Sequence, residues 1–381
     1  MKWGKVKVGD CCEVTSSKRI FFSEYVDSGV PFYRSKEIIE SSNGQAISEP
    51  LFISQEKYDE IKNHFGVPQS GDMLLTSVGT IGVPYIVREK DYFYFKDGNL
   101  TWFRNFSDEL DSKYLYFWVK SSEGQSVLNN TTIGSSQKAL TIASLKGLEI
   151  PCPPAPVQKR IVEFLAGYDD LIENNQKQIK LLEEAAQRLY KEWFVDLRFP
   201  GHENVKIVDG VPEGWENASV TDLLEIRYGK DHKGLADGCI PVYGSGGIMR
   251  KVDKILYSGE SVLIPRKGSL NNILLVSGDF WTIDTMFYSV PKRPNVAKYV
   301  YLYLTGIDMY AMNIGAAVPS MSVKILDGMR LLCPSDSILE LFETTAKPYY
   351  EMIELLKKKQ SMLGETRDRL LPKLMSGEIE V

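Results

Sequence analysis

The chain has 381 residues, of which 43% are hydrophobic and 25% charged, so its composition excludes wholesale disorder. Lys and Arg total 45 and Asp and Glu total 50; the net charge of −5 excludes a polyanion binder that works by bulk positive charge. Five scattered cysteines without a Cys-x-x-Cys pair, no apolar run of ~18 residues and no secretory leader predict a cytoplasmic protein. We expect no metal site, no disulfide framework and no membrane span.

The first predicted region is globular and covers residues 1–150. The region is rich in Tyr, Phe, Val, Ile and Gly and contains short apolar runs such as residues 72–78. Turn residues separate these runs, which is typical of short strands in a mixed α/β fold.

The second region, residues 151–200, is predicted to be helical. Four prolines between 151 and 156 precede apolar residues that alternate at spacings of four and three. This heptad pattern predicts a coiled-coil helix with a break or kink at Gly167. Its seam, which we expect to form the helix pair or a partner interface, consists of Ile161, Leu165, Ile172, Asn175, Ile179, Leu182 and Leu189.

A second globular region (207–334) and a second helical region (335–381) follow. The second helix carries Pro348 where the first carries Gly167, so we expect a break or kink there too. Its seam consists of Ile353, Leu356, Gln360, Leu363, Arg367 and Leu370.

The two halves of the chain are repeats of one another. Residues 133–153 reappear as residues 314–334, with Cys152 matching Cys333 at an offset of 181. The openings match at an offset of 212, which pairs Trp3 with Trp215 and Lys18 with Lys230. The larger offset means that the first half carries about thirty extra residues.

The repeat predicts an α/β (α+β) fold with two similar mixed globular domains. One heptad helix alone would favour a bundle helix, but two related helices in one chain favour an intramolecular coiled coil. Antiparallel pairing is preferred because parallel pairing would require a return path of ~42 Å. We therefore expect two globules separated by a long antiparallel coiled coil and related by a pseudo-two-fold axis.

Several short motifs resemble those of type I restriction-modification specificity subunits. They are Val-Pro-Glu-Gly-Trp (211–215), Gln-Lys-Arg-Ile-Val (158–162) and Trp-Phe-Val-Asp-Leu (193–197). The resemblance extends over nearly the whole chain, including the duplication. It departs at Val157, where the family usually has Glu, and at residues 337–339, which lack the Glu-Gln pair. We expect that departure to alter a helix-start hydrogen bond or a subunit contact.

The resemblance implies two target-recognition domains, 1–150 and 207–334, and two conserved helical regions, 151–200 and 335–381. Each domain would read one half of a bipartite, asymmetric site on double-stranded DNA, and the coiled coil would set the spacer. Two methyltransferase subunits would bind this chain, with restriction subunits in the full complex. Catalysis, S-adenosylmethionine, ATP and Mg²⁺ would belong to the partner subunits.

Candidate DNA contacts come from loops that combine glycine with basic or hydroxyl side chains. Each could equally be a solvated loop, and the residue types alone do not separate contacts to bases from contacts to phosphates. The candidates are Lys18, Arg19, Ser77, Thr80, Ser136, Lys138, Arg227, Lys230, His232, Lys233, Arg266 and Lys267.

An enzyme is the first alternative, either alone or as part of a fused restriction enzyme. The only Pro-Pro, at 153–154, follows Cys152, so no Asn/Asp-Pro-Pro-aromatic methyltransferase motif exists. A Walker loop is absent, the three histidines are isolated and residues 244–247 form a Gly-rich turn without the setting of a nucleotide loop. The second alternative is a coiled-coil protein–protein adaptor without DNA binding.

Overall fold

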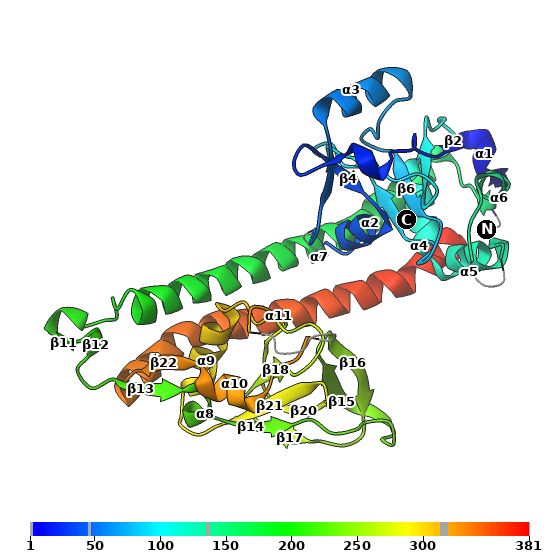
Figure 1. The fold of residues 1–381 in the computed structure, drawn as a ribbon. Coiled ribbons are helices and arrows are strands. Elements are labelled where there is room, and N and C mark those ends of the chain that lie inside the picture. Colours follow the sequence, from blue (N-terminus) through cyan, green and yellow to red (C-terminus); the bar gives the residue numbers. More distant parts are fainter. Residues whose placement is uncertain (1–2, 45–46, 135–137, 313–318, 381) are drawn as a thin grey trace. The chain divides into compact units, whose positions relative to one another are not determined.

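The computed structural model describes residues 3–44, 47–134, 138–312 and 319–380 (Figure 1). It divides into two compact units: unit 1 is formed by residues 1–177 and 357–381, and unit 2 by residues 178–356. Within the described ranges, no helix has both the length and the apolar character that crossing a membrane requires.

Unit 1 contains short strands and helices followed by the first long helix. Its elements are β1 (Lys5–Lys7), α1 (Val8–Cys11), β2 (Glu13–Thr15), a 3₁₀ turn (Phe22–Glu24), β3 (Tyr25–Val26), β4 (Val30–Tyr33), α2 (Ser35–Ser42), β5 (Leu51–Ile53), α3 (Gln55–His64), β6 (Met73–Thr76), β7 (Pro84–Ile86), β8 (Tyr94–Phe95), β9 (Leu100–Arg104), α4 (Ser112–Lys120), α5 (Ser122–Thr131), α6 (Ile142–Lys146), β10 (Glu149–Pro151) and α7 (Ala155–Tyr190), which continues into unit 2.

Unit 2 follows with a π-helical turn and a second α/β assembly. Its elements are the π turn (Lys191–Val195), a 3₁₀ turn (His202–Asn204), β11 (Ile207–Val208), β12 (Val211–Pro212), β13 (Glu216–Ser219), α8 (Val220–Leu223), β14 (Leu224–Tyr228), β15 (Asp237–Gly244), β16 (Gly247–Val252), β17 (Tyr257–Ser258), β18 (Ser261–Pro265), β19 (Leu274–Val276), β20 (Asp279–Thr282), β21 (Met286–Pro291), α9 (Val296–Thr305), α10 (Val323–Gly328), β22 (Arg330–Cys333) and α11 (Asp336–Met375), which returns to unit 1.

The two units share the strand order of one four-stranded sheet and differ in one edge strand of the other, β3 in unit 1 and β17 in unit 2. Unit 1 has a four-stranded sheet β2-β9-β6-β7, and unit 2 has the matching sheet β14-β21-β18-β19. A second sheet contains one parallel pair in each unit, β4 with β8 and β15 with β20. Each unit also contains a two-stranded antiparallel sheet that pairs an early strand with its last strand, β1 with β10 in unit 1 and β13 with β22 in unit 2. The sequence repeat is therefore a repeat of the fold.

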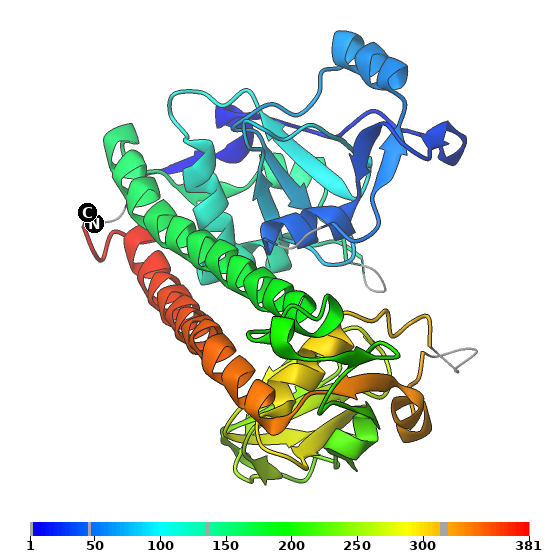
Figure 2. The ribbon, with the colours of Figure 1, turned by 90° about the vertical axis from the view of Figure 1, so that its left-hand side faces the viewer.

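The extra residues of the first half lie between β4 and β6, in the segment that contains α2, β5 and α3 (blue in Figures 1 and 2). In unit 2 the corresponding connection contains only β16 and β17. The insertion belongs to its unit's core, because Tyr58 and Ile61 of α3 are buried against Ile53 and Val67.

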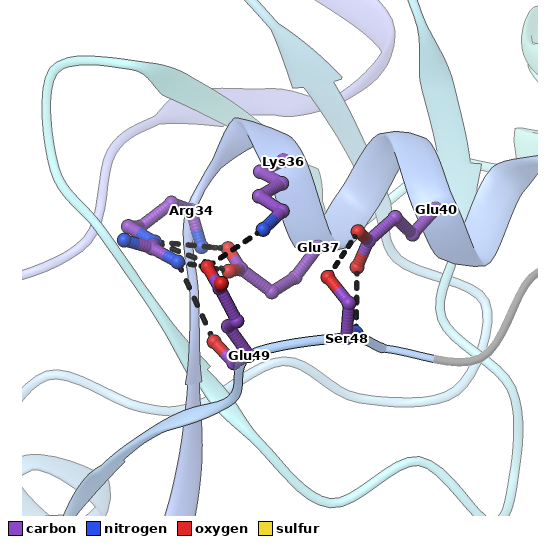
Figure 3. A network of polar contacts seen from close by, with 6 residues as sticks. All are labelled: Arg34, Lys36, Glu37, Glu40, Ser48 and Glu49. Carbon is purple, nitrogen blue, oxygen red and sulfur yellow. Dashed lines mark hydrogen bonds and ion pairs between the residues drawn. The ribbon is translucent and has the colours of Figure 1, made fainter. Parts of the chain in front are cut away.

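A polar network holds α2 in place, as Figure 3 shows. The Arg34 backbone N–H donates to Glu37 Oε2 at 2.7 Å, and the Arg34 guanidinium donates to the same carboxylate. Arg34 and Lys36 also reach the segment before β5, through the carbonyl and carboxylate of Glu49 at 3.5 and 2.9 Å. Because Glu37 is fully buried, its paired charge fixes the start of α2.

In unit 1, α7 and α11 pair in antiparallel orientation. Ile161 and Leu165 share a core with Leu374, and farther along α7 the carbonyl of Ile172 accepts a hydrogen bond from Gln360 Nε2 at 3.1 Å. Residue numbers on α11 therefore fall as those on α7 rise.

In unit 2 the same orientation holds. Ile179 packs against Ile353 and Leu356, whereas Phe194, after the end of α7, contacts Phe342 with ring centroids 4.8 Å apart. The predicted antiparallel pairing is confirmed within each unit.

The helices do not break at Gly167 or Pro348, because α7 and α11 run through both positions as continuous helix, and a kink at either position stays a prediction. Pro348 has no N–H to donate to the carbonyl of Thr344. Both residues are exposed, so water can satisfy that carbonyl without the helix breaking.

Candidate nucleic-acid interface

In unit 2, three loops meet at the turn formed by residues 282–285. The Lys230 N–H donates to the Thr282 carbonyl at 2.8 Å, and the Arg266 N–H donates to the Thr285 carbonyl at 2.8 Å. The Ile283 N–H donates to the Tyr243 carbonyl at 3.0 Å, which brings the end of β15 to the same turn. The structure therefore joins the two basic segments that the sequence singled out, although 36 residues separate Lys230 from Arg266.

The side chains around this turn combine positive charge with an aromatic ring. Lys230, Lys233 and Lys267 are exposed. Arg266 is half-buried, with its guanidinium carbon 5.4 Å from the ring centroid of Tyr228, itself 55% exposed. Such a stack is a favourable cation–π contact.

Two other candidates in unit 2 are less available. Arg227 lies on β14 with its guanidinium bound to the Glu225 carboxylate through two hydrogen bonds of 2.9 Å. His232 is half-buried, and its Nδ1 has no hydrogen-bond partner among the described atoms.

Unit 1 contains the corresponding meeting point. The Ser77 N–H donates to the Asn99 carbonyl at 2.8 Å, and the Lys18 N–H donates to the Tyr94 hydroxyl at 2.6 Å. The Gly98 N–H reaches Ser16 Oγ at 3.4 Å, so the loop before Lys18 also contacts this turn.

Matching hydrogen bonds make Ser77 and Arg266 equivalent positions. The Ser77 carbonyl accepts from the Leu140 N–H at 2.9 Å, and the Arg266 carbonyl accepts from the Met321 N–H at 2.9 Å. Leu140 and Met321 correspond at the repeat offset of 181. Both units therefore use the same backbone frame, with a hydroxyl side chain in one and a guanidinium in the other.

The prediction that Ser77 presents its hydroxyl to DNA is not supported by its position. Ser77 is 2% exposed, and its Oγ lies 2.7 Å from Thr101 Oγ1 inside the sheet. Thr80 and Lys138 on the neighbouring loops are exposed, whereas the predicted contact Ser136 lies outside the described residues.

Lys18 and Arg19 are exposed at the edge of the same region. Lys18 Nζ lies 4.8 Å from the ring centroid of Phe65, and Arg19 Nε pairs with Asp97 at 2.8 Å. The pairing with Asp97 lowers the local positive charge, so unit 1 presents a weaker basic surface here than unit 2.

The predicted seam residues lie along the paired helices, and every one is buried or half-buried. Asn175 is 2% exposed, and its Nδ2 has no hydrogen-bond partner among the described atoms. Gln360 Nε2 donates to the Ile172 carbonyl, and Arg367 Nη1 pairs with Asp169. The half-buried members are Ile172, Leu182, Leu189, Gln360, Leu363, Arg367 and Leu370.

The Gln158 motif lies at the start of α7, and the matching position at the start of α11 differs in chemistry. Gln158 is fully buried, where its Oε1 accepts from the Asp111 N–H at 2.9 Å and its Nε2 donates to the Glu109 carbonyl at 2.7 Å. The matching residue of the second repeat, Leu339, is buried in an apolar core. The first helix start is thus fixed by a polar network and the second by packing.

Sequence reasoning did not identify the turns that organise these surfaces. Residues 282–285 and Asn99 act through backbone carbonyls, which leave no side-chain signature in a sequence. Tyr228 could have been found from its place between Arg227 and Lys230. In the described ranges, His, Cys, Asp and Glu side chains form no group of three that could hold a metal ion.

The chain is similar to known proteins of one kind, the specificity subunits of type I restriction systems. Residues 1–184 match the family model of the type I restriction modification DNA specificity domain. The chain is 26% identical to the type I restriction enzyme MjaIX specificity subunit of Methanocaldococcus jannaschii, over 100% of this chain and 94% of that protein. A putative type I restriction enzyme specificity subunit of Haemophilus influenzae is 29% identical over 49% of this chain and 45% of its own length.

A solved structure supports the same assignment at the level of the fold. The type I restriction-modification S subunit from M. genitalium aligns with a TM-score of 0.59 and 18% identity, covering 98% of this chain and 96% of that one. The family model covers the first half, the M. jannaschii relative covers the whole chain, and the second half repeats the fold of the first. Residues 1–184 thus match the type I restriction modification DNA specificity domain, and the chain as a whole is similar to a type I restriction enzyme specificity subunit.

Proposed function

We propose that this chain is the DNA sequence-recognition subunit of a type I restriction-modification complex and that each unit reads one half of a bipartite site. The observation that carries the proposal is the pair of equivalent loop frames. Backbone hydrogen bonds hold Ser77 and Arg266 at the same position, and different side chains surround each. A shared scaffold with divergent loops suits two readers of two different sequences.

The paired helices α7 and α11 would set the spacing between the half-sites. Polar side chains at seam positions, such as Asn175 and Gln360, restrict the register of a helix pair because they tolerate few alternative alignments. A fixed register gives a fixed spacing, and two linked readers then bind only sites of matching separation.

The chain would act with partners and not catalyse a reaction itself. We propose that two methyltransferase subunits dock on it, with restriction subunits joining the full complex. S-adenosylmethionine, ATP and Mg²⁺ would be bound by those subunits and not by this chain. The near-neutral net charge supports this division, because methyltransferase subunits would then supply much of the phosphate contact.

The test is a region exchange followed by mapping of methylated sites. Residues 207–334 are replaced by the equivalent region of a related subunit, and the complex is reconstituted with its methyltransferase. We expect one half of the site to change while the other half and the spacer are kept. The reciprocal exchange of residues 1–150 is the matched control and should change only the other half.

A change in both halves, or in neither, would contradict two independent readers. If the protein bound its partners normally but deletion of the gene left DNA methylation unchanged, the chain would instead be a protein–protein adaptor.

A further inference from the structure

We infer that Arg266 is a base-reading residue that contacts a guanine in the half-site bound by unit 2. We further infer that unit 1 makes no such contact from the equivalent position. The inference rests on the proposed function and assigns a chemical identity to one contact.

The backbone of Arg266 is fixed on both sides. Its N–H donates to the Thr285 carbonyl at 2.8 Å, and its carbonyl accepts from the Met321 N–H at 2.9 Å. A residue whose N–H and carbonyl are both bonded presents its side chain from a defined point, as sequence-specific contact requires.

The side chain is also oriented. Its guanidinium stacks over Tyr228 at 5.4 Å, and Nη1 donates to the Asp284 carbonyl at 3.3 Å. These contacts hold the plane of the group and use one of its five N–H donors. A planar fork held in this way can donate two parallel hydrogen bonds to the O6 and N7 acceptors of guanine.

Arg266 differs from Arg227 and Arg250, the two arginines on strands β14 and β16, in having no carboxylate partner within the described structure. Arg227 pairs with Glu225, and Arg250 pairs with Asp237, each at 2.9 Å. The remaining N–H donors of the Arg266 guanidinium are therefore available for an external acceptor.

The surroundings fit a base edge better than a phosphate alone. The turn between β15 and β16 packs on the loop after Arg266, because the Ser245 carbonyl accepts from Asn272 Nδ2 at 2.8 Å. Ile248 and Met249 follow that turn and are 61% and 56% exposed. Apolar side chains of this kind contact base edges and methyl groups, while Lys230 and Lys267 supply charge for phosphates.

In unit 1 the equivalent Ser77 points into the sheet, with Oγ at 2.7 Å from Thr101 Oγ1. It offers no donor to the surface. The guanine contact is consequently a property of one half-site and contributes to the asymmetry of the whole site.

The experiment uses the full chain reconstituted with its methyltransferase and duplexes carrying the site found by methylome sequencing. The exchange of residues 207–334 identifies the half-site of unit 2. Each guanine of both half-sites is replaced in turn by 7-deazaguanine, which lacks the N7 acceptor. Because O6 is retained, we expect one guanine in the unit 2 half to lose affinity by a smaller factor than the about 5- to 150-fold of a whole bidentate pair.

Arg266→Ala removes both hydrogen bonds, so it should lose about 5- to 150-fold on the unmodified site and become insensitive to 7-deazaguanine at that one position. Arg266→Lys keeps the charge but not the fork, so it should also lose the discrimination. Tyr228→Ala should weaken the discrimination and Tyr228→Phe should preserve it. Lys254→Ala, which removes an exposed lysine between β16 and β17, should leave the base preference unchanged.

Thermal unfolding of each variant checks that it is folded, and the retained fold of Arg266→Lys keeps the test valid if Arg266→Ala unfolds. A uniform loss on all sequences with a smaller salt dependence would assign Arg266 to a phosphate and overturn the inference alone. A unit 2 half-site without guanine would also overturn it. Absence of any sequence-specific binding by the wild-type complex would overturn the proposed function as well.

Discussion

The two units carry one matching four-stranded sheet on different sequences, and they differ where side chains reach the surface. Backbone hydrogen bonds hold Ser77 and Arg266 in the same frame, yet one side chain is buried and the other is stacked on Tyr228. The backbone hydrogen bonds at this position therefore do not depend on which side chain the residue carries. A fold maintained by its backbone leaves recognition residues free to diverge between repeats.

The helices α4 and α9 are matching elements of the two units, but the lysine at the equivalent position of each has a different environment. Tyr114 on α4 donates to the Pro151 carbonyl at 3.0 Å, and Tyr299 on α9 donates in the same way to the Leu332 carbonyl. The preceding residues are Lys113, which is exposed, and Lys298, which is 7% exposed. One lysine is solvated and the other is part of a buried ion cluster.

The largest expected effect comes from breaking that cluster. Lys298 Nζ lies 2.5 Å from Glu260 Oε1 and 2.7 Å from Glu343 Oε1. Burial lowers the pKa of Lys298, but the two carboxylates outweigh it and raise that pKa, so the lysine stays charged. Lys298→Met leaves two partly buried carboxylates without a cation and should cost about 3–5 kcal/mol in the free energy of unfolding.

The control is Lys113→Met at the equivalent exposed position, which should change stability by less than about 0.5 kcal/mol. Urea unfolding of both variants measures the difference. Equal effects would mean that the buried cluster contributes nothing beyond an ordinary surface lysine.

A smaller effect is expected where the first helix begins. Gln158→Leu gives unit 1 the residue that unit 2 has at Leu339, but it leaves the Asp111 N–H and the Glu109 carbonyl without their partner. Unsatisfied buried groups cost about 1–3 kcal/mol each, less what water recovers, so we expect a loss of about 2 kcal/mol. Calorimetric melting that shows no loss would mean that the polar network is dispensable.

The pH dependence of unit 1 gives a third test, through the insertion that unit 2 lacks. Burial raises the pKa of Glu37, but hydrogen bonds from the Arg34 guanidinium and backbone outweigh it and lower that pKa below its ordinary value. A lowered pKa contributes stability above the unfolded pKa of about 4.3, and that stability is lost as the pH falls through the folded pKa.

Glu37→Gln should therefore destabilise the protein by about 1–2 kcal/mol at pH 7. The gap from wild type should narrow as the pH falls below about 4.3. Urea unfolding over this pH range measures it, and a gap that widened on acidification would contradict the assigned sign.

The repeat and the helix pair could be predicted from the sequence because both leave recurring side-chain patterns. Ile161 and Ile353 occupy heptad positions and are buried, as their spacing predicts. The helices do not break at Gly167 and Pro348, since an exposed proline can be accommodated when water reaches the freed carbonyl. A residue's helix-breaking tendency is thus weaker than the packing on both sides of it.

The recognition surface is harder to predict because its geometry depends on contacts between distant residues. Nothing near Ser77 in the sequence shows that Thr101 will hold its hydroxyl in the sheet. The turn that joins Lys230 to Arg266 uses the carbonyls of Thr282 and Thr285, which any residue would supply. Basic loops could be identified, but not which of their side chains are oriented and which are solvated.

The smallest expected effect concerns Lys230 and its repeat counterpart Lys18. Both are exposed, and the N–H of each is anchored to the strand that pairs in parallel within its unit, β20 or β8. If each contacts one phosphate, Lys230→Ala and Lys18→Ala should weaken binding on all sequences alike.

Each substitution should also reduce the slope of log K against log salt concentration by about one. Binding of the reconstituted complex is measured between about 50 and 200 mM salt, the range in which counterion release changes affinity strongly. The double variant should lose about two units of slope, because contacts in separate half-sites are expected to add. Lys254→Ala provides the reference for loss of an exposed lysine outside the two loops. A change in base preference in either single variant, with the slope retained, would mean that the lysine reads a base and does not contact a phosphate.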